Sequence, residues 1–314
     1  MVLDFEKQVS EIENKIYELK QMSQNSGLDL SSEIKILESQ AYEYKCELYA
    51  NLKPFQKMQI ARHTNRPNFL DYVNLIAEDF IELHGDRHGA DDRAMIGGVC
   101  HIGEKSVMLV GTQKGKNTKE NLEYNFGMPQ PEGYRKALRL FEHANRFNLP
   151  IITLIDTPGA YPGIKAEQTN QGEAIAFNLK EMGKLKVPIV AIITGEGCSG
   201  GALGIGVANK VLMLEHAYYT VISPEGCASI LWRDVTKAEE ASEALKITAC
   251  DLLKYKIIDD VIKEPLGGAH MDYNETAKNM KDMILRSLSE FDKMKGEQIV
   301  QHRYNKFRKM GVFI

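Results

Sequence analysis

The sequence predicts an α/β fold that is preceded by an antiparallel helical hairpin. Two observations support this fold class: apolar runs of strand length recur along the chain, as at 151–155 and 187–194, and stretches with helical periodicity separate them. Strands that are apolar on both faces are typical of parallel sheets covered by helices on each side. A chain of 314 residues, 43% of them hydrophobic, can bury one large core and carry an appendage. We therefore expect a helical hairpin at 1–53 and an α/β domain with a helical C-terminal tail at 54–314.

The first 53 residues are charged, poor in Gly and Pro, and helical in period. Apolar residues recur every three or four positions in two stretches, which are Val9, Ile12, Ile16 and Leu19, and then Ile34, Leu37, Ala41, Tyr44 and Leu48. A Ser/Gly/Asp segment at 23–32 separates the two stripes, and Asp29, Ser31 or Ser32 suits the cap of the second helix. Two such stripes predict an antiparallel hairpin, which either packs on its own domain or docks a partner subunit.

Residues 54–314 alternate between helical and strand patterns. Apolar spacings of three and four predict helices at 68–83, 134–147, 167–184, 236–253 and 274–288. Apolar runs bounded by Gly, Pro or polar residues predict strands at 94–102, 106–112, 151–155, 187–194, 211–214 and 219–222. Gly103 and Glu104 mark the turn between the first two strands, and a polar, glycine-bearing segment occupies 113–133. A loop at 156–163 follows one buried strand, and a glycine-rich segment at 195–206 follows the next.

The composition argues against several classes of protein. The net charge is −4 and the pI is near 6.1, so the chain has no excess of positive charge that would favour binding to nucleic acid or to an anionic membrane. The N-terminal residues lack the apolar core of a signal peptide, and no apolar run reaches the roughly 18 residues of a membrane span. An odd number of scattered cysteines without a C-x-x-C pair fits a reducing cytoplasm and argues against a structural zinc site; they are Cys46, Cys100, Cys198, Cys227 and Cys250. We expect a cytoplasmic protein.

The segment 195–206 matches two catalytic patterns. Gly195, Gly197 and Gly200 form G-x-G-x-x-G after a predicted strand, and Glu215 stands about where a ribose-binding acid is expected. The pattern G-x-S-x-G also matches, with Ser199 as nucleophile and Asp234 and His270 following in the order of a hydrolase triad. The first interpretation leaves a very short crossover helix, and downstream Asp and His residues are easy to find in any chain.

A third interpretation of this segment needs no reactive side chain. Glycines at a helix start let the backbone approach a ligand, with free N–H groups aimed at an anion. Aimed at an oxygen that becomes negative in the transition state, the same groups form an oxyanion hole. The alternative is a glycine-rich helix start that serves only tight helix packing.

Long runs of residues carry a family resemblance along nearly the whole chain. They are 61–63 with 66–67, 83–87 with 91–92, 113–115, 125–129, 131–137, 155–163, 199–203, 222–232 and 264–270. With these runs the chain resembles the carboxyltransferase alpha subunits of bacterial acetyl-CoA carboxylase. Where that family usually continues Glu-Arg-Gly-Gln, this chain has Gln168, Thr169, Asn170 and Gln171. Cys198 stands where the family usually has glycine, and Gly204 where it often has alanine.

The resemblance implies a crotonase-like superhelix of β-β-α units whose oxyanion holes are made of backbone N–H groups. It implies transfer of a carboxyl group from carboxybiotin, held on a biotin carboxyl carrier protein, to acetyl-CoA, giving malonyl-CoA for fatty acid synthesis. It also implies an α2β2 heterotetramer with the active site at the α–β interface, zinc only on the beta subunit, and biotin carboxylase as a further partner of the ATP-dependent complex. We therefore expect this chain itself to bind no cofactor and no metal. We also expect it to contact neither nucleic acid nor a membrane.

The resemblance assigns roles to named residues of this chain. Gly200 and Gly201 donate the N–H groups of the hole that serves the ureido oxygen of biotin, while Ser199 and Ala202 shape the turn. The opposite wall comes from Gly159, Ala160, Tyr161, Pro162 and Gly163, unless these form only a tight turn after a strand. Biotin freed of its carboxylate can act as the base, so no acid–base pair is required of the protein.

Other charged residues leave alternatives open. Lys114, Lys116, Arg135 and Lys136 either meet CoA phosphates or belong to the solvated surface. His63, His84 and His270 are candidate bases or hydrogen-bonded structural histidines.

Two other function classes compete with the subunit hypothesis. One is a self-contained acyl-CoA hydratase, isomerase or decarboxylase with a side-chain acid or base, and the other is a non-catalytic partner-binding subunit.

Overall fold

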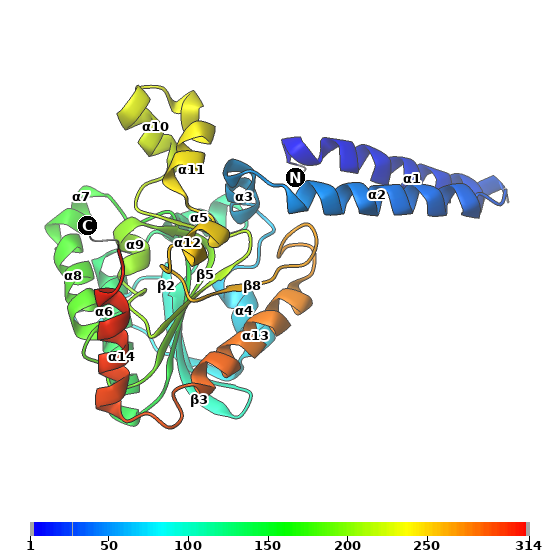
Figure 1. Cartoon of the computed structure of the whole chain (residues 1–314). Helices are drawn as coiled ribbons and strands as arrows, with labels where there is room; N and C mark the ends of the chain where they lie inside the picture. Colours follow the sequence, from blue (N-terminus) through cyan, green and yellow to red (C-terminus); the bar gives the residue numbers. More distant parts are fainter. Residues whose placement is uncertain (1–2, 27, 312–314) are drawn as a thin grey trace.

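The computed structural model of the chain describes residues 3–26 and 28–311. Outside this range lie the first two residues of the predicted hairpin domain, Gly27 of the predicted hairpin loop, and the last three residues of the predicted α/β domain. Among the described residues, an eight-stranded sheet forms the centre of the fold, with helices on both of its sides (Figure 1).

The sheet has the order β1-β2-β3-β4-β5-β6-β8, and β7 pairs with the end of β5. The strands β1, β2 and β3 pair antiparallel, and the pairs from β3 through β8 are parallel. The strands are β1 (Glu78–Glu82), β2 (Met95–Ile102), β3 (Lys105–Thr112), β4 (Ile151–Thr157), β5 (Ile189–Cys198), β6 (Lys210–Leu214), β7 (Tyr218–Thr220) and β8 (Asp260–Ile262). Every residue of β4 and β5 is buried, as expected for parallel strands covered on both faces.

The helices divide between the two faces of this sheet. In Figure 1, α6 (Pro131–Phe147), α8 (Gln171–Met182) and α14 (Gly296–Arg308) lie on one side. The helices α4 (Phe69–Ile76) and α13 (Tyr273–Ser289) lie on the other. The helix α6 buries a stripe with spacings of three and four, which are Tyr134, Ala137, Leu138, Phe141 and Ala144. This amphipathic spacing explains why the segment is helical and which of its faces meets the sheet.

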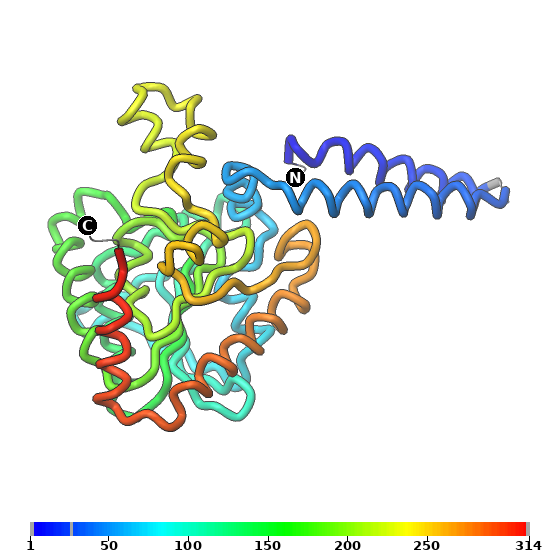
Figure 2. The backbone as a smooth tube through the Cα atoms, viewed as in Figure 1, coloured from blue at the N-terminus to red at the C-terminus, as the bar shows by residue number. Residues whose placement is uncertain are grey.

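The first two long helices, α1 (Lys7–Ser26) and α2 (Ser31–Ala50), run side by side and extend away from the sheet (Figure 2). Between them Tyr44 donates a hydrogen bond to Gln8, and Lys45 pairs with Glu13 at 3.5 Å. Their base joins the body through a small apolar cluster of Leu3, Tyr49, Leu52 and Ile60, and Lys45 of α2 lies beside Gly267. Most of the hairpin therefore does not pack on its own domain, and docking of a partner by it stays a prediction.

The helices α10 (Pro224–Trp232) and α11 (Ala238–Leu245) also project from the body, on the edge where β4 and β5 end (Figures 1 and 2). Ser223 caps α10 by accepting a hydrogen bond from the N–H of Gly226 at 3.0 Å. No helix was predicted at the position of α10, although Ser-Pro-Glu at 223–225 has the residues of a helix start.

The predicted helix at 68–83 is wrong in its second half. The helix α4 ends at Ile76, and the chain continues as the edge strand β1. Gly98 of β2 permits this pairing, because a Cβ at Gly98 would lie only 2.1 Å from the carbonyl oxygen of Ile81. Asp79 has a φ of 53°, which produces the register shift within β1. The spacing of apolar residues, on which the predicted helix rests, contains no information about such a close backbone approach.

Two other predicted helices are interrupted. The segment 167–184 divides into α7 (Ile164–Gln168) and α8, because Asn170 takes a φ of 68° between them. The segment 236–253 divides into α11 and α12 (Ala249–Lys254) at Lys246, whose φ is 53°. After this break, the carbonyl of Ile247 accepts a hydrogen bond from the N–H of Tyr219 at 3.1 Å, so pairing with β7 competes with the helix.

The remaining elements follow the predicted order with shifted ends. The segment 113–133 also contains α5 (Thr118–Glu123), and β8 lacks a predicted counterpart because it has only three residues. The strand predicted at 187–194 continues through Cys198, which places the first four residues of the glycine-rich segment inside β5. In the described part of the chain, no helix is long and apolar enough to cross a membrane.

One buried arginine fixes the last helix to the body. Arg303 of α14 donates hydrogen bonds to the carbonyl oxygens of Met182 (2.7 Å), Leu185 (2.8 Å) and Val187 (2.8 Å), and to Oδ1 of Asn209 (2.7 Å). Its side chain is 1% exposed. The guanidinium thus satisfies carbonyls at the end of α8 and the start of β5 that would otherwise be buried without a donor.

We expect Arg303→Met to lower the free energy of unfolding by about 3 kcal/mol, because several buried acceptors lose their donor together. Urea unfolding followed by circular dichroism measures this change. Arg308→Met is the matched control on the exposed side of the same helix, and its effect should stay within about 0.5 kcal/mol. Equal stability of the two variants would contradict this role of Arg303.

Candidate active site

Two loops at the ends of parallel strands come together at one edge of the sheet. The strands β4 and β5 are neighbours, and their register pairs Thr157 with Gly197. The segment 158–163 leaves β4 beside the point where the chain leaves β5 into α9 (Ser199–Leu203). A Cβ placed on Gly201 would lie 2.4 Å from the carbonyl carbon of Gly159 and 2.6 Å from the nitrogen of Ala160. The two glycine segments named by the sequence analysis are therefore in direct backbone contact.

The turn into α9 begins at Ser199. Ser199 has a φ of 53°, a left-handed conformation that is rare for a residue other than Gly, Asn or Asp. The side chain of Ser199 is exposed, whereas Gly201 and Ala202 are buried. The first N–H groups of a helix have no acceptor within that helix, and the N-cap residue Cys198 offers no side-chain hydrogen bond to them. The turn therefore presents backbone donors at the edge of the sheet.

The glycines of this segment have different reasons for being glycine. Gly201 lies against the Gly159 backbone, as described, so a side chain would separate the two loops. At Gly200 a Cβ would meet only the side chain of Ile175, at 3.4 Å from Cδ1 and 3.7 Å from Cγ2, which are ordinary contacts. At Gly195 it would lie 2.5 Å from Oδ1 of Asp156, inside the strand pair. Close approach therefore explains Gly201 and Gly195, but not Gly200.

The opposite loop is held by its own hydrogen bonds. The hydroxyl of Thr157 donates to the carbonyl of Gly159 at 2.7 Å, and the N–H of Tyr161 donates to the carbonyl of Pro129 at 3.0 Å. Gln171 at the start of α8 donates to the carbonyl of Tyr161 at 3.1 Å. Gly163 lies under the ring of Tyr161, where a Cβ would come within 2.3 Å of Cε1. Ala160 packs on the main core. The predicted wall residues thus form one supported loop facing α9.

A partly buried lysine lies below these two loops. Nζ of Lys114, at the end of β3, makes ion pairs of 2.6 Å with Oδ1 of Asp156 and 2.6 Å with Oε1 of Glu196. Oδ1 of Asp156 also accepts the N–H of Glu196 at 2.8 Å. Asp156 stands two residues before the segment 158–163, and Glu196 stands three residues before Ser199. Lys114 therefore ties together the strand ends that carry both sides of the candidate site.

The other oxygen of Glu196 continues the network. Oε2 accepts hydrogen bonds from Nε of Arg62 at 2.8 Å and from the hydroxyl of Tyr218 on β7. Arg62 in turn pairs with Glu225 of α10 at 2.6 Å. Burial alone raises the pKa of a carboxyl group, but the charges of Lys114 and Arg62 prevail and lower the pKa of Glu196 to about 2. Glu196 is therefore ionised at neutral pH.

A second buried ion pair supports β5 from the other side. Both terminal nitrogens of Arg66 donate to the carboxylate of Glu264, at 2.9 and 2.7 Å, and Nε donates to the carbonyl of Thr194 at 2.8 Å. Glu264 also accepts the backbone N–H groups of His216 and Ala269. Although burial opposes ionisation, the charge of Arg66 lowers the pKa of Glu264 to about 2. The end of β5 is thus fixed by bidentate, charge-assisted bonds.

A cavity of about 280 Å³ opens beside this network. Its lining includes Arg62, Arg66, Lys114, Lys116 and Pro158. In the described residues, no group of three or more His, Cys, Asp or Glu side chains is arranged to hold a metal ion. The charged groups of the site are thus arranged in ion pairs around the strand ends.

The dinucleotide interpretation of 195–206 is wrong. Gly195 and Gly197 belong to a strand, and the helix that follows has five residues. Glu215 pairs with Lys263 at 2.6 Å. The serine hydrolase interpretation is also wrong, because Asp234 caps Thr236 and His270 stacks on His63 with ring centroids 4.0 Å apart. In the part of the chain that the structure describes, neither of them bonds to Ser199.

The four candidate CoA-binding cations fall into different environments. Lys114 is in the ion-paired cluster, and Lys136 is 1% exposed, with its ammonium on Asp91 and the carbonyl of Asp92. The ammonium groups of Lys114 and Lys136 are therefore engaged inside the protein, and neither of the two predicted alternatives, a CoA phosphate contact or a solvated surface, describes them. Arg135 is half-buried against Asp86 and the carbonyl of Thr169. Lys116 is exposed beside Asp71.

The histidines are structural in two of three cases. His63 is buried, His270 is half-buried, and their rings stack on each other. Burial, with the nearby charges of His63 and Arg66, lowers the pKa of His270 to about 4, so it is neutral at pH 7. His84 is exposed and lies 3.1 Å from Asp91, in a loop away from the glycine turn.

The departures from the family pattern have physical explanations. Asn170 stands where the family has glycine, and its φ of 68° is one that asparagine tolerates better than most residues. Thr169 stands where the family has arginine. Its backbone carbonyl accepts a hydrogen bond from Arg135. Cys198 is buried beside the hydroxyl of Tyr218, and burial raises the pKa of its thiol to about 12. Gly204 lies under the ring of Tyr134, where a Cβ would come within 2.6 Å.

The sequence analysis missed the paired roles of Asp156 and Glu196. Both are acidic residues at the ends of otherwise apolar buried strands, and that position is the signal that was available. Their partners Lys114 and Arg62 lie far away along the chain, and only the order of the strands brings them together.

Comparisons with known proteins identify relatives of the whole chain. The family described as "Acetyl co-enzyme A carboxylase carboxyltransferase-like" matches residues 2–311. The acetyl-coenzyme A carboxylase carboxyl transferase subunit alpha of Prochlorococcus marinus (strain NATL2A) is 54% identical over 313 residues, which cover 100% of this chain and 95% of that protein. The protein of the same name from Trichodesmium erythraeum (strain IMS101) is 51% identical, covering 100% and 97%.

Solved structures show the fold at lower identity. Transcarboxylase 12S with methylmalonyl-coenzyme A and methylmalonic acid bound has a TM-score of 0.58 and 19% identity, covering 70% of this chain and 40% of that chain. A Pseudomonas malonate decarboxylase hetero-tetramer in complex with coenzyme A has a TM-score of 0.58 and 11% identity, covering 70% and 89%. This chain thus spans about two fifths of the transcarboxylase chain. These similarities establish the crotonase-like α/β fold.

The Lys114 cluster predicts a pH-dependent loss of stability. Lys114→Met leaves two buried carboxylates without their shared cation, and we expect the free energy of unfolding at pH 7 to fall by about 3–5 kcal/mol. The stabilisation from a lowered carboxyl pKa is present above the unfolded pKa and is lost as the pH falls through the folded value of about 2. The difference between wild type and variant should therefore narrow between about pH 4.5 and pH 2.

Urea unfolding at a series of pH values measures this difference. Lys119→Met, on the exposed side of α5, is the matched control and should change stability by less than about 0.5 kcal/mol. A difference between wild type and Lys114→Met that stays constant down to the acid limit would argue against the ion-pair explanation.

Proposed function

The chain belongs to the acetyl-CoA carboxylase carboxyltransferase-like family, and on this premise we propose how its residues perform carboxyl transfer. Its activity is that of a carboxyltransferase alpha subunit, which works with a beta subunit to transfer a carboxyl group to acetyl-CoA and form malonyl-CoA for fatty acid synthesis. The enzyme is a transferase that acts in a multi-subunit complex.

The reaction develops negative charge on two oxygens. When the bond between N1 of biotin and the carboxyl group breaks, charge moves to the ureido oxygen of biotin. When the acetyl methyl group loses a proton, charge moves to the thioester oxygen, and the resulting enolate carbon takes up the released carboxyl group. Each oxygen is stabilised most by donors that already point to it before the reaction. Two oxyanion holes are therefore proposed, one in each subunit.

The hole proposed in this chain is the turn into α9. The N–H groups of Gly200 and Gly201 are its donors, for the ureido oxygen of biotin, and Ser199 and Ala202 shape the turn. The single observation that carries this assignment is the backbone contact between Gly201 and Gly159, which fixes an uncapped helix start against a second loop. The segment Gly159, Ala160, Tyr161, Pro162 and Gly163 is proposed as the opposite wall of the biotin-binding site.

The buried charges below the turn are proposed to hold its geometry rather than to transfer protons. Lys114 has both of its carboxylate partners at 2.6 Å, and the ionised carboxylate of Glu196 is bonded to Lys114, Arg62 and Tyr218. The proton of the acetyl methyl group is proposed to go to N1 of biotin, once the carboxyl group has left. A fixed backbone and a substrate that acts as base are together sufficient for the transfer.

The assembly and the location of the chain complete the proposal. The active site is proposed to lie between alpha and beta in an α2β2 heterotetramer, with carboxybiotin delivered on the biotin carboxyl carrier protein and made by biotin carboxylase. Zinc is proposed only for the beta subunit. A cytoplasmic location is proposed from the metabolic role, and the five cysteines with free thiols agree with a reducing compartment.

Activity with and without the beta subunit tests the proposal. We expect the purified chain alone to show no carboxyl transfer between biotin and CoA, and the mixture with the beta subunit to show it, because half of the site lies on each chain. The assay follows malonyl-CoA-dependent carboxylation of biotin. Activity of the chain alone would favour a self-contained acyl-CoA enzyme, whereas a complex that forms and stays inactive would favour a scaffolding subunit.

A substitution in the proposed hole tests the assignment of residues. Gly201→Val introduces a branched side chain where even a Cβ has no space, so α9 must move away from Gly159. We expect kcat to fall by about 100-fold or more, as in measured losses of oxyanion-hole donors, while the complex with beta still forms. Carboxyl transfer kinetics and gel filtration of the complex provide the two readings.

Gly172→Ala is the matched control. Gly172 lies in α8 with nothing within 4 Å of an added Cβ, so the complex should keep its full activity. If Gly201→Val also keeps wild-type kcat, the turn is not the hole.

A further inference from the structure

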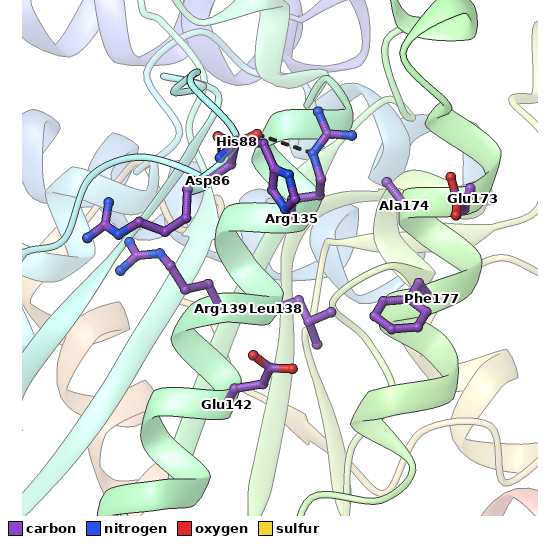
Figure 3. A pocket seen from close by; sticks show the side chains of 10 residues that line it. Asp86, His88, Arg135, Leu138, Arg139, Glu142, Glu173, Ala174 and Phe177 are labelled. Carbon is purple, nitrogen blue, oxygen red and sulfur yellow. Dashed lines mark hydrogen bonds and ion pairs between the residues drawn. The ribbon is translucent and has the colours of Figure 1, made fainter.

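A second and larger cavity lies on the outer face of α6 and α8. Its volume is about 690 Å³, within the range of small-molecule sites. Leu138, Arg139 and Glu142 of α6 and Glu173 and Phe177 of α8 line it. In Figure 3 Leu138 faces Phe177, whereas Arg139 points away from α8. The loop that carries Asp86, Arg87 and His88 closes one end. None of these residues has a part in the proposed carboxyl transfer.

Two arginines at the loop end lack an acidic partner. Arg87 donates to the carbonyl of His84 at 2.9 Å, and Arg139 donates to the same oxygen at 3.1 Å and to the carbonyl of Leu83 at 3.1 Å. Their guanidinium groups are thus brought against each other. Among residues 3–26 and 28–311, no carboxylate forms an ion pair with either of them, and Nε of Arg139 is buried without an acceptor.

The loop is built to present Arg87. Gly85, Arg87 and Gly89 all have positive φ, of 81°, 66° and 101°. Asp86 is 3% exposed and closes the loop by accepting the N–H groups of His88 and Ala90 on one oxygen. A left-handed arginine persists only where its surroundings impose it. The second oxygen of Asp86 takes Arg135, so this carboxylate does not neutralise the other two arginines.

The opposite end of the cavity has a different character. Phe177 is 48% exposed, and in Figure 3 its ring faces Leu138 across the gap, so that a flat ring could stack there. Glu142 of α6 and Glu173 of α8 also line the cavity, are exposed, and form no ion pair within the described residues. Carboxylates in this position suit ligand hydroxyl or amino groups, as in ribose-binding sites.

We propose that this cavity binds a purine nucleotide, with phosphate between Arg87 and Arg139 and the purine ring on Phe177 and Leu138. Two guanidinium groups without a carboxylate match the charge and geometry of a phosphate group. The same chemistry is present in a free nucleoside diphosphate and in the 3′-phospho-ADP end of CoA. The proposal goes beyond carboxyl transfer, and its readout is binding, so its failure leaves the proposed function untouched.

Calorimetric titration of the chain assembled with its beta subunit tests the site, with ADP, GDP, CoA and pyrophosphate as probes. We expect ADP or GDP to bind with a Kd below about 100 μM. Arg87→Gln and Arg139→Gln should each raise that Kd about tenfold or more, because each removes a charge-assisted phosphate contact. Arg146→Gln is the matched control, an exposed arginine in the last turn of the same helix, and should leave the Kd unchanged.

Further readings separate the possible ligands. Phe177→Ala should weaken nucleotide binding but not pyrophosphate binding. If CoA displaces ADP and Arg87→Gln weakens the binding of both, the natural ligand is the nucleotide end of CoA. If CoA leaves ADP bound, the natural ligand is a free nucleotide. Because Arg139 also holds two loop carbonyls, thermal unfolding of each variant shows whether it is folded, and Arg87→Gln carries the test if Arg139→Gln is not.

Three results would overturn the proposal. The first is no binding of either nucleotide up to about 1 mM. The second is a nucleotide Kd that neither arginine substitution changes, because the nucleotide would then bind elsewhere. The third is pyrophosphate binding as tight as ADP binding with no effect of Phe177→Ala, which would indicate an anion site without a ring-binding part.

Discussion

The ion pairs of Lys114 with Asp156 and Glu196 are the constraint on which the candidate site depends. One ammonium group lies 2.6 Å from a carboxylate at the end of β4 and 2.6 Å from another at the end of β5. The loops that leave these two strands are the two sides of the proposed biotin site. Removing Lys114 would leave the carboxylate of Asp156 buried without its cation and that of Glu196 with Arg62 alone, which is costly in the interior of a protein. The cluster therefore fixes the strand ends more tightly than strand pairing alone.

The turn above the cluster combines strain and close approach in a few residues. Ser199 has a φ of 53°, Gly201 lies against the backbone of Gly159, and the helix that follows is uncapped. Such a backbone is unfavourable in isolation and persists because neighbouring elements determine it. Fixed N–H donors need no rearrangement as charge develops, which is the main source of catalysis in oxyanion holes. Fixed charges below and a strained backbone above thus serve one purpose, to hold donors in place for an oxygen supplied by the substrate.

The longer strands and helices of the α/β domain and the two glycine segments were predictable from the sequence, because apolar runs and helical stripes are local signals. Helix interruptions at Asn170 and Lys246 were not, since a left-handed residue is imposed by tertiary contacts. The same holds for β1, whose pairing depends on the missing side chain of Gly98. Lys114 was noticed as a surface cation, yet its two partners lie 42 and 82 residues away and meet it only through the strand order. The reaction itself came from the resemblance, whereas the geometry that supports it came from the structure.

In the proposed mechanism the N–H groups of Gly200 and Gly201 hold the ureido oxygen of biotin. A crystal structure of the alpha–beta complex with biotin bound measures the relevant distances directly. The account predicts both backbone nitrogens at about 2.7–3.1 Å from that oxygen, with the segment 159–163 along the other side of the ring. An ureido oxygen held by a side chain, or by donors of the beta subunit alone, would contradict it.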